Sequence, residues 1–351
     1  MTLKEIIIEK IRTGGPITFR EFMEMCLYYP ELGFCMSPNC SIGKDGSFYT
    51  SAYLTSAFGA VIGKQLEEMW NTLGRGEFTV VEYGAGTGIL CHDILCYLKN
   101  NHGEMYEQLS YSIIEKSPVM RKVEKKLLTE KVSWYHSVGE MPQFRGCIFS
   151  NELVDNFAVH QVVMADELME VYVSYDNGFN ELLRPAGPEL REYIEELGIN
   201  LPNGFRTEVN LEAKHWVKEV VHALAQGYVM TIDYGHLSNE LYKQSRSNGT
   251  LLCYQNHRIN ESFYEDIGQQ DITSHVNFSA LRYWGENSGL KEHWFTDQCQ
   301  FLLAMGFNDF LNQSLSQEKD ILLAAKKASM IRHTLLFDMG TKFKVLVQKK
   351  E

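Results

Sequence analysis

Apolar and polar positions follow two different periods along this chain, and the change from one period to the other marks its elements. An apolar run from Phe78 to Val81 predicts a buried strand, and apolar residues recur at helical spacing from Ile89 to Leu98. Gly84, Gly86 and Gly88 lie between these two segments and predict a tight turn. The pattern is therefore a strand, a Gly-rich turn and a helix, in that order.

Further strand patterns follow, separated by helical patterns. They cover Tyr111–Glu115, Val132–His136, Gly146–Ser150, Gly227–Gly235 and Phe343–Gln348. A strand that repeatedly alternates with a helix is typical of an α/β fold with a parallel sheet. A helical pattern covers Thr296–Ala304, Gly306-Phe307 opens a short strand and a helix covers Leu315–Arg332. The last strand pattern ends the chain after what we expect to be a short excursion. We therefore expect an antiparallel terminal strand at the edge of the sheet.

Two stretches interrupt this alternation. The first, at about 165–225, contains two strand-like runs joined by Asn177-Gly178, which favours a hairpin turn. The second, at about 236–295, is rich in Asn, Ser, Gln and His as far as Asn287, and we predict it to be too polar for the core. Both are interpreted as insertions into a core domain that covers residues 76–351.

The first 75 residues are predicted to form a mostly helical cap in front of this core. A helical pattern ends at Gly14-Gly15-Pro16, and a second begins after Thr18. Thr18 with Glu21 three residues later is the pattern of a capping box.

Composition and charge narrow the function classes. The net charge of −12, with no run of Lys and Arg before Lys349-Lys350, argues against nucleic-acid binding. No stretch reaches the roughly twenty apolar residues of a membrane span. Residues 1–10 contain Glu5 and Glu9 and do not match a signal or transit peptide, so we expect a cytoplasmic protein. The eight cysteines include no Cys-x-x-Cys pair, and no metal site is expected.

The glycine spacing indicates which nucleoside cofactor the turn suits. A dinucleotide fingerprint requires a third glycine at position 89, where Ile89 stands. The pattern here is acid-x-Gly-x-Gly-x-Gly starting at Glu82, and it resembles the first motif of S-adenosylmethionine-dependent methyltransferases. Glu82, Gly84, Ala85, Gly86 and Gly88 are therefore candidate cofactor-binding residues. The alternative is a turn with a purely structural role.

Glu115 ends the second strand of the predicted sheet. An acid at that position lies beside the glycine turn in a doubly wound sheet and can accept hydrogen bonds from ribose hydroxyls. Glu115 is therefore a further cofactor candidate. The alternatives are that it faces water or caps the helix that starts near Ser117-Pro118.

Several ordered segments resemble the MidA-type methyltransferase family, which includes a mitochondrial protein-arginine methyltransferase that assists assembly of respiratory complex I. The matching segments are Gly15–Phe19, Tyr29–Phe34, Phe48–Ser51, Val81–Gly88, Ser150–Asp155 and Gln270–Val276. The resemblance implies a Rossmann-like class I methyltransferase sheet, S-adenosyl-L-methionine as cofactor, and arginine methylation of a partner protein, by analogy a respiratory-chain subunit. The chain departs from the family pattern at Ser47, Ala158 and Gln269.

The resemblance also nominates residues for the chemistry. Ser150-Asn151-Glu152 is similar to the first acidic loop of protein-arginine methyltransferases, so Glu152 is the candidate that orients a guanidinium, with Asn151 beside the cofactor. Asp155, three residues on, is expected to share a helical face with Glu152. The alternatives are that Asn151 and Glu152 cap a helix and that Asp155 is a solvated acid in its first turn.

Two further residues complete the candidate site. His275 is a candidate proton carrier with Asp271 one turn before it, against a structural role for this histidine. Thr50 is placed in a loop that closes over the cofactor, against an ordinary polar turn.

Two other readings of the sequence stay open. One is an assembly chaperone that holds a partner subunit and uses the cofactor as a structural ligand, and the other is an oxidoreductase on a related sheet. Ile89 and the terminal strand speak against the oxidoreductase. The oligomeric state, with a homodimer as one option, is open as well.

Overall fold

The computed structural model describes residues 1–37, 51–255, 258–316 and 318–351. By internal contacts the chain forms two compact units. The accessory unit consists of Met1–Phe48, Val154–Trp216 and Gly235–Trp284, and the core unit consists of Tyr49–Leu153, Val217–Tyr234 and Gly285–Glu351. Residues 1–75, predicted as one cap, therefore contribute to both units.

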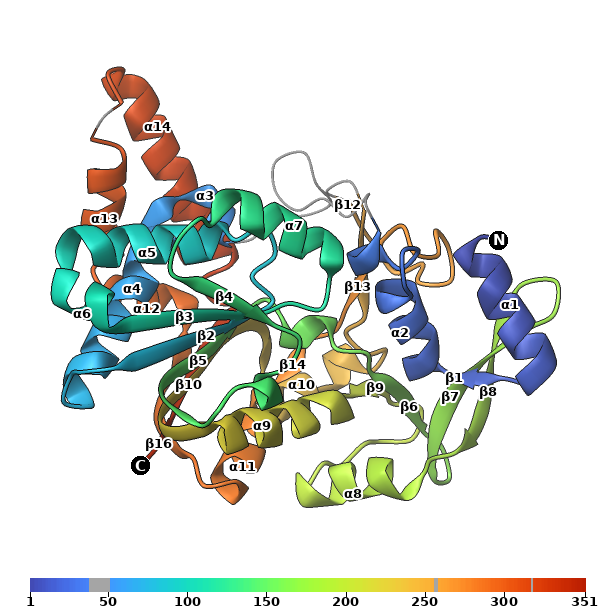
Figure 1. Ribbon diagram of the computed structural model, residues 1–351. Helices are drawn as coiled ribbons and strands as arrows, with labels where there is room; N and C mark the ends of the chain where they lie inside the picture. Colours follow the sequence, from blue (N-terminus) through green and yellow to red (C-terminus); the bar gives the residue numbers. More distant parts are fainter. Residues whose placement is uncertain (38–50, 256–257, 317) are drawn as a thin grey trace. The chain divides into compact units, whose positions relative to one another are not determined.

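The core unit is built around a sheet with the strand order β15-β16-β10-β5-β2-β3-β4 (Figure 1). The strands are β2 (Phe78–Tyr83), β3 (Leu109–Ile114), β4 (Val132–Tyr135), β5 (Phe144–Asn151), β10 (Leu224–His236), β15 (Lys291–Asp297) and β16 (Phe343–Lys350). Five of them, from β4 to β10, pair in parallel, whereas β16 runs antiparallel to both β10 and β15. The predicted α/β sheet with an antiparallel terminal strand is confirmed.

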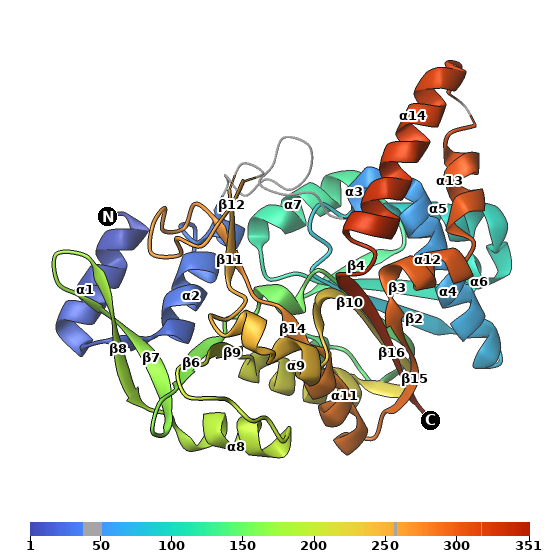
Figure 2. The same cartoon turned by 180° about the vertical axis from the view of Figure 1, so that it is seen from behind.

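The terminal strand is not the edge strand, which corrects one expectation. Figure 2 shows β16 next to β15, and the pairing puts β16 between β10 and β15. β15 was missed because its first residues, from Lys291 to His293, are polar and exposed and give no strand pattern. Val345 and Val347 of β16 are fully buried, as expected for an interior strand.

The connection between β15 and β16 is a helical excursion, and it is longer than predicted. It contains α12 (Gln298–Ala304), α13 (Phe307–Ser314), α14 (Ile321–Arg332) and a π-helical turn, η5 (His333–Asp338). The strand expected at Gly306-Phe307 is wrong: Gly306 has φ +85° and precedes α13, because Phe307 and Leu311 are buried at helical spacing.

Helices pack against the sheet of the core unit. The remaining helices of this unit are α3 (Ser51–Leu54), α4 (Ser56–Thr72), α5 (Ile89–Asn101), α6 (Gly103–Gln108), α7 (Pro118–Leu127) and the 3-10 turn η2 (Val138–Glu140). Phe58 and Ile62 of α4 and Ile94 of α5 are fully buried in one apolar cluster with Val80 and Phe149 of the sheet. This burial fixes β2 and α5, and with them the turn that joins them.

The accessory unit contains two small sheets and short helices. The strands of these sheets are β1 (Ile17–Thr18), β6 (His160–Met164), β7 (Leu168–Tyr175), β8 (Phe179–Pro185), β9 (Arg206–Val209), β11 (Leu252–Gln255), β12 (Arg258–Asn260) and β13 (Asp271–Thr273). A further short strand, β14 (Val276–Asn277), pairs in parallel with Gly235 and His236 at the end of β10. The helices of the unit are α1 (Leu3–Gly14), α2 (Phe19–Tyr28), α8 (Pro188–Glu196), α10 (Ser238–Leu241) and the 3-10 turns η1 (Phe34–Met36), η3 (Val154–Asn156) and η4 (Gln244–Arg246). α9 (Leu211–Ala223) and α11 (Phe278–Asn287) begin in this unit and end in the core unit.

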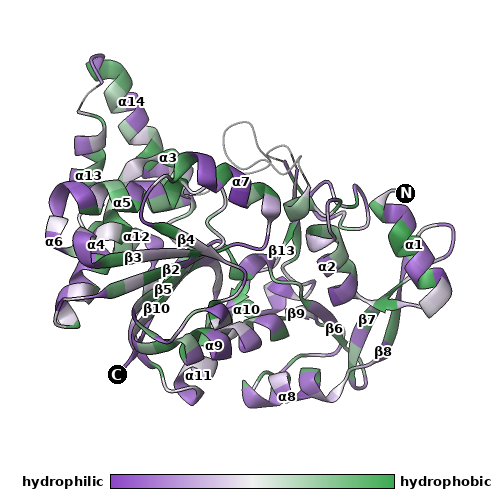
Figure 3. Cartoon of the chain, in the orientation of Figure 1, coloured by the Kyte–Doolittle hydropathy of each residue, from purple (hydrophilic) through white to green (hydrophobic). Residues whose placement is uncertain are grey.

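Local sequence signals of the accessory unit are confirmed. Thr18 and Glu21 form the predicted capping box at the start of α2. The β7–β8 hairpin turns at Asn177-Gly178, where Asn177 has φ +53°. The helix α1 carries both apolar and polar residues (Figure 3), and its Ile7 is fully buried.

The prediction that residues 236–287 are too polar for the core is wrong. Cys253, Ile272 and Phe278 are buried, and the first two belong to the apolar cluster beneath α1 and α2. The error arises because apolar residues there occur in short strands separated by polar turns, so no long periodic run signals them.

The structure also bears on disulfide bonds, membrane-spanning helices and metal sites. Seven cysteines of the described residues are free. Among those residues no helix has the length and apolar character needed to span a bilayer. Nor does the described part of the chain contain a group of three or more His, Cys, Asp or Glu side chains placed to hold a metal ion.

Candidate functional site

The turn between β2 and α5 has a backbone that favours glycine. Gly84, Gly86 and Gly88 have φ values of +67°, +58° and +80°, in the left-handed region. Gly88 is the N-cap of α5 and makes no side-chain capping bond, so the first N–H groups of this helix point into the turn without a side-chain acceptor from the cap. The turn can therefore present backbone N–H groups to the oxygen atoms of a ligand.

At two of these glycines, close packing leaves little room for a larger side chain, whether or not a ligand is bound. A Cβ atom at Gly84 would lie 2.9 Å from Leu153 Cδ1, and one at Gly88 would lie 3.0 Å from Leu128 Cδ1. The glycine pattern therefore reflects both backbone conformation and tight packing.

Glu115 lies beside this turn, where the sequence analysis placed it. It directly follows β3 and is 8% exposed, and its Oε1 accepts a hydrogen bond from Ser117 N–H at 2.6 Å. Burial raises the pKa of Glu115 to about 7, although N–H groups of Ser117, Gly86 and Lys116 and the charge of Arg121 oppose this. The hydrogen bond from Gly86 joins the acid to the middle of the glycine turn. Its role as a ribose ligand stays a prediction.

Two other buried acids lie close to Glu115. Glu82 accepts a hydrogen bond from Tyr111 OH at 2.7 Å, and Glu124 accepts one from Trp134 Nε1 at 2.7 Å. Burial, together with the charge of Glu115, raises the pKa of Glu82 to about 7 and that of Glu124 to about 8. The Oε1 atom of Glu124 is buried and has no hydrogen-bond partner in the described part of the chain.

The turn and Glu115 test which cofactor the corner fits. S-adenosylmethionine needs an acceptor for its ribose hydroxyl groups, which Glu115 beside the turn can supply, and it carries no pyrophosphate. Ile89 stands where a dinucleotide motif has its third glycine, so the residues present fit S-adenosylmethionine better than NAD. Glu82 itself faces Tyr111 inside the unit, and its cofactor role stays a prediction.

The carboxyl end of β5 forms a second part of the candidate site, besides the glycine turn and Glu115. β5 ends at Asn151, and Glu152 follows with φ +55° while its N–H donates to Ile232 O at 2.9 Å. Glu152 Oε1 accepts hydrogen bonds from Ser51 N–H and from Asn151 Nδ2, both at 3.2 Å. Ser51 and Asn151 therefore hold this carboxylate, and Ile232 of β10 holds the backbone that carries it.

The expectation that Glu152 shares a helical face with Asp155 is wrong. The left-handed backbone at Glu152 ends the strand, and the 3-10 turn η3 follows it in place of an α-helix. The capping alternative loses its basis for the same reason.

Asp233 is a residue that the sequence analysis did not select. It lies near the end of β10 and is fully buried, and its Oδ2 accepts a hydrogen bond from Leu153 N–H at 3.1 Å. Its Oδ1 accepts one from Tyr234 N–H at 2.9 Å. Asp233 thus holds the loop that carries Glu152. The signal was available, because an apolar strand that ends in an acid is uncommon unless the acid is used.

Two polar groups complete this part of the site. Asn151 Oδ1 is buried and has no hydrogen-bond partner among the described residues, so this amide retains an acceptor for a ligand. Tyr53 OH donates to Thr87 Oγ1 at 2.7 Å and joins α3 to the glycine turn. Thr50, the candidate next to α3, lies outside the described residues.

Asp155 and His275 belong to the accessory unit. The carbonyl of Asp155 accepts a hydrogen bond from Ser274 N–H, and His275 N–H donates to Thr250 Oγ1, both at 3.0 Å. Asp271 lies in β13 and not in a helix, so the expected helical turn between it and His275 is wrong. Burial and the charge of Asp155 raise the pKa of Asp271 to about 8. The catalytic roles of Asp155 and His275 stay predictions.

Comparison with known proteins decides the family. Residues 61–296 match the model of a family described as "Putative S-adenosyl-L-methionine-dependent methyltransferase", which is more than half of the chain. The chain belongs to this family. S-adenosylmethionine is accordingly its cofactor, and the strand order of the core unit is that of a methyltransferase.

Similar proteins agree with this assignment. A COG1565 superfamily member from Burkholderia thailandensis, crystallised with S-adenosyl-homocysteine, superposes with a TM-score of 0.87 and is 28% identical, covering 99% of this chain and 92% of that chain. A Caenorhabditis elegans protein named protein arginine methyltransferase NDUFAF7 homolog, mitochondrial, is 27% identical, covering 97% of this chain and 85% of the relative. The human protein arginine methyltransferase NDUFAF7, mitochondrial, is 23% identical, covering 92% and 80%.

The names of these relatives also correct one prediction. The Caenorhabditis, zebrafish and human proteins are all named as mitochondrial, which contradicts the cytoplasmic location expected from the sequence. That expectation relied only on the composition of the first residues, and this is a weak signal.

Proposed function

We propose that this methyltransferase transfers the methyl group of S-adenosylmethionine to an arginine side chain of a partner protein. The observation that carries the proposal is the Glu152 carboxylate, held at the carboxyl end of β5 by Ser51 N–H and Asn151 Nδ2. The relatives named as protein arginine methyltransferases support the same acceptor. The resemblance to the MidA-type family implies that the partner is a subunit of a respiratory complex.

An arginine acceptor needs a carboxylate. A free guanidinium has a pKa above about 12 and its nitrogen lone pairs are delocalised, so it is a poor nucleophile. A carboxylate that accepts two of its N–H groups fixes the plane of the group, draws positive charge away from the attacking nitrogen and accepts the proton that is lost. Glu152 is assigned this task, and Asp233 positions it by holding the following N–H.

The bound cofactor supplies an electrophilic methyl group on a sulfonium. We assign its binding to the turn residues Gly84, Ala85, Gly86 and Gly88, to Glu115 and Asn151 beside them, to the charge of Glu82, and to Thr50. Most of the rate enhancement in such a displacement comes from alignment within a dry pocket. Asp155 and His275 are proposed as further catalytic groups, with no step assigned to either.

Cofactor choice gives the first expected result. In titration calorimetry the full chain should bind S-adenosylhomocysteine with a Kd of about micromolar order and give no heat with NAD. The glycine turn, Glu115 beside it and the missing third glycine of a dinucleotide motif are the reasons. Tight binding of NAD with no response to S-adenosylhomocysteine would contradict the assignment of this corner.

The identity of the methyl acceptor is tested by transfer of a radioactive methyl group. Lysate from a strain that lacks this protein should gain a tritium-labelled protein band when the purified chain and tritiated S-adenosylmethionine are added. Mass spectrometry should then locate methylarginine in that band. A label on lysine, on a small molecule or on no acceptor at all would overturn the arginine proposal.

A further inference from the structure

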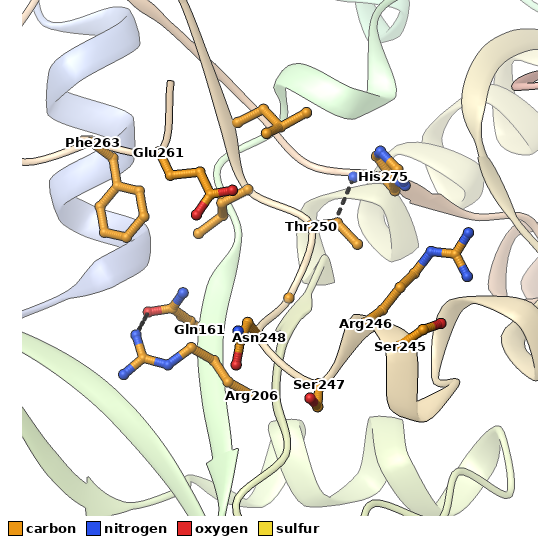
Figure 4. A pocket seen from close by; sticks show the side chains of 13 residues that line it. Gln161, Arg206, Ser245, Arg246, Ser247, Asn248, Thr250, Glu261, Phe263 and His275 are labelled. Atoms are coloured by element: carbon orange, nitrogen blue, oxygen red, sulfur yellow. Dashed lines mark hydrogen bonds between the residues drawn. The ribbon is translucent and has the colours of Figure 1, made fainter. Parts of the chain in front are cut away.

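The accessory unit contains a polar pocket that none of the cofactor-binding candidates lines and that includes one of the catalytic candidates, His275. Its volume is about 490 Å³, and its lining includes Gln161, Arg206, Arg246, Asn248 and His275 (Figure 4). Pockets that bind ligands in proteins span about 300–1,000 Å³. All of these residues lie within one unit, so the pocket is complete in itself.

One of its two arginines is already neutralised. Arg206 forms a two-pronged ion pair with Glu181, with Nη1 2.9 Å from Oε1, and its Nη1 also donates to Gln161 Oε1 at 2.8 Å. Tyr264 OH donates to the same carboxylate at 3.0 Å. Arg206 therefore holds β9 to β8 and contributes little free charge to the pocket.

The other arginine meets only neutral acceptors. Arg246 Nη1 donates to the carbonyl of Glu240 at 2.6 Å, and its Nη2 donates to His236 Nε2 at 3.0 Å. The Glu240 carboxylate is bound by Lys243 Nζ at 2.6 Å, and no ion pair with Arg246 occurs in the described part of the chain. The guanidinium is fixed in position while its charge lacks a bound carboxylate.

Hydrogen-bond donors without acceptors surround this charge. The Gln161 side chain is 1% exposed, and its Oε1 is occupied by Arg206 while its Nε2 has no acceptor among the described residues. The Nδ2 of Asn248 and the hydroxyl groups of Ser245 and Ser247 also lack acceptors within that part of the chain. The pocket offers a cation that no carboxylate binds directly, although the charge of Glu240 lies near it, together with several donors, and this combination suits an anion. Glu261 on the lining is exposed to solvent, and the buried Glu208 behind the lining is already bound by Thr250 N–H and Oγ1.

We infer that this pocket binds the carboxylate of an acidic side chain in the acceptor protein, with Arg246 as its charge partner and Gln161 and Asn248 as additional donors. The inference rests on the proposed function, because it takes the ligand to be a segment of the methylated protein. It predicts that the acceptor carries an Asp or Glu near the methylated arginine. Because Glu152 attracts a cation, a separate site for an anion would give the enzyme a second criterion for its substrate.

Binding of a small probe tests the pocket without the acceptor. Ligand-observed NMR on the full chain should show binding of Ac-Glu-NH2, whose only carboxylate is on the side chain, at about millimolar affinity, and no binding of the uncharged Ac-Gln-NH2. Arg246→Gln should weaken Ac-Glu-NH2 binding at least about 10-fold, because a charged hydrogen-bond partner is lost. Arg191→Gln is the matched control: Arg191 is half exposed, pairs with Glu167 in the same unit, and should not affect binding.

A second variant keeps the inference testable if Arg246→Gln does not fold. Asn248→Ala removes a side chain that makes no hydrogen bond within the described residues, so it should fold normally and still weaken Ac-Glu-NH2 binding. Equal binding of Ac-Glu-NH2 and Ac-Gln-NH2, binding of inorganic phosphate alone, or unchanged binding in Arg246→Gln and Asn248→Ala would overturn the inference.

Transfer kinetics separate this inference from the proposed function. With the labelled acceptor, Arg246→Gln should raise the KM for that protein about 10-fold while kcat and S-adenosylhomocysteine affinity stay unchanged. If the wild-type chain labels no arginine, the proposed function fails, but the probe result still decides whether the pocket selects carboxylates. If arginine is labelled and the KM of Arg246→Gln equals that of the wild type, the pocket has no role in acceptor binding.

Discussion

Replacing Gly86 by Val should abolish S-adenosylhomocysteine binding while leaving the sheet folded. Gly86 has φ +58°, a conformation that costs a β-branched residue of the order of 1–3 kcal/mol. Its N–H donates to Glu115, so a shifted backbone would also displace the acid that stands beside the cofactor. In addition, a side chain at this position would keep the ligand from coming close to the backbone of the turn. Titration calorimetry and the melting temperature measure the two effects separately.

A matched glycine distinguishes backbone strain from loss of the site. Gly74 has φ +87°, and a Cβ atom there would meet no atom within 4 Å. Gly74→Val should therefore lower the melting temperature to a similar extent but bind S-adenosylhomocysteine as the wild type does. A Gly86→Val variant that binds normally would move the cofactor away from this turn.

The glycine corner and its neighbours were predictable because they are local signals. The buried strand, the turn and the helix follow one another within a few residues, so hydrophobic period and glycine spacing suffice to place β2 and α5. Glu115 was placed correctly for a related reason, because parallel strands of a doubly wound sheet end at a common edge.

Other parts of the site depend on contacts between distant segments. Ser51 and Glu152 are far apart in the sequence, and so are Leu153 and Asp233, yet both pairs are joined by hydrogen bonds. No periodic pattern encodes such a contact, so the role of Asp233 was missed. The left-handed backbone at Glu152 was also unpredictable, because Glu rarely adopts this conformation.

The edge strand β15 was not predicted from the sequence, for a different reason. A strand at the edge of a sheet needs few apolar residues, and its polar first half resembles a loop. The burial of residues within 236–287 was not predicted, because short strands separated by polar turns give no hydrophobic period long enough to detect.

Replacing Glu152 by Gln should lower methyl transfer by roughly 10²-fold or more while S-adenosylhomocysteine affinity barely changes. Gln retains the shape of Glu and can still accept hydrogen bonds from Ser51 N–H and Asn151 Nδ2 through one oxygen. It loses the negative charge and the second equivalent oxygen, and these are what a guanidinium needs from this side chain.

The control for this variant is Glu140→Gln, which removes an exposed carboxylate that accepts only from His136 N–H at 3.2 Å in the same unit. This control should retain full activity. If Glu152 has a structural role alone, Glu152→Gln should lower the melting temperature and weaken cofactor binding together, because the loop held by Asp233 would loosen. If Glu152→Gln methylates the identified partner at the wild-type rate, Glu152 does not orient the acceptor. The arginine mechanism would then be wrong, and an assembly chaperone that uses the cofactor as a structural ligand would explain the geometry of the corner better than an enzyme does.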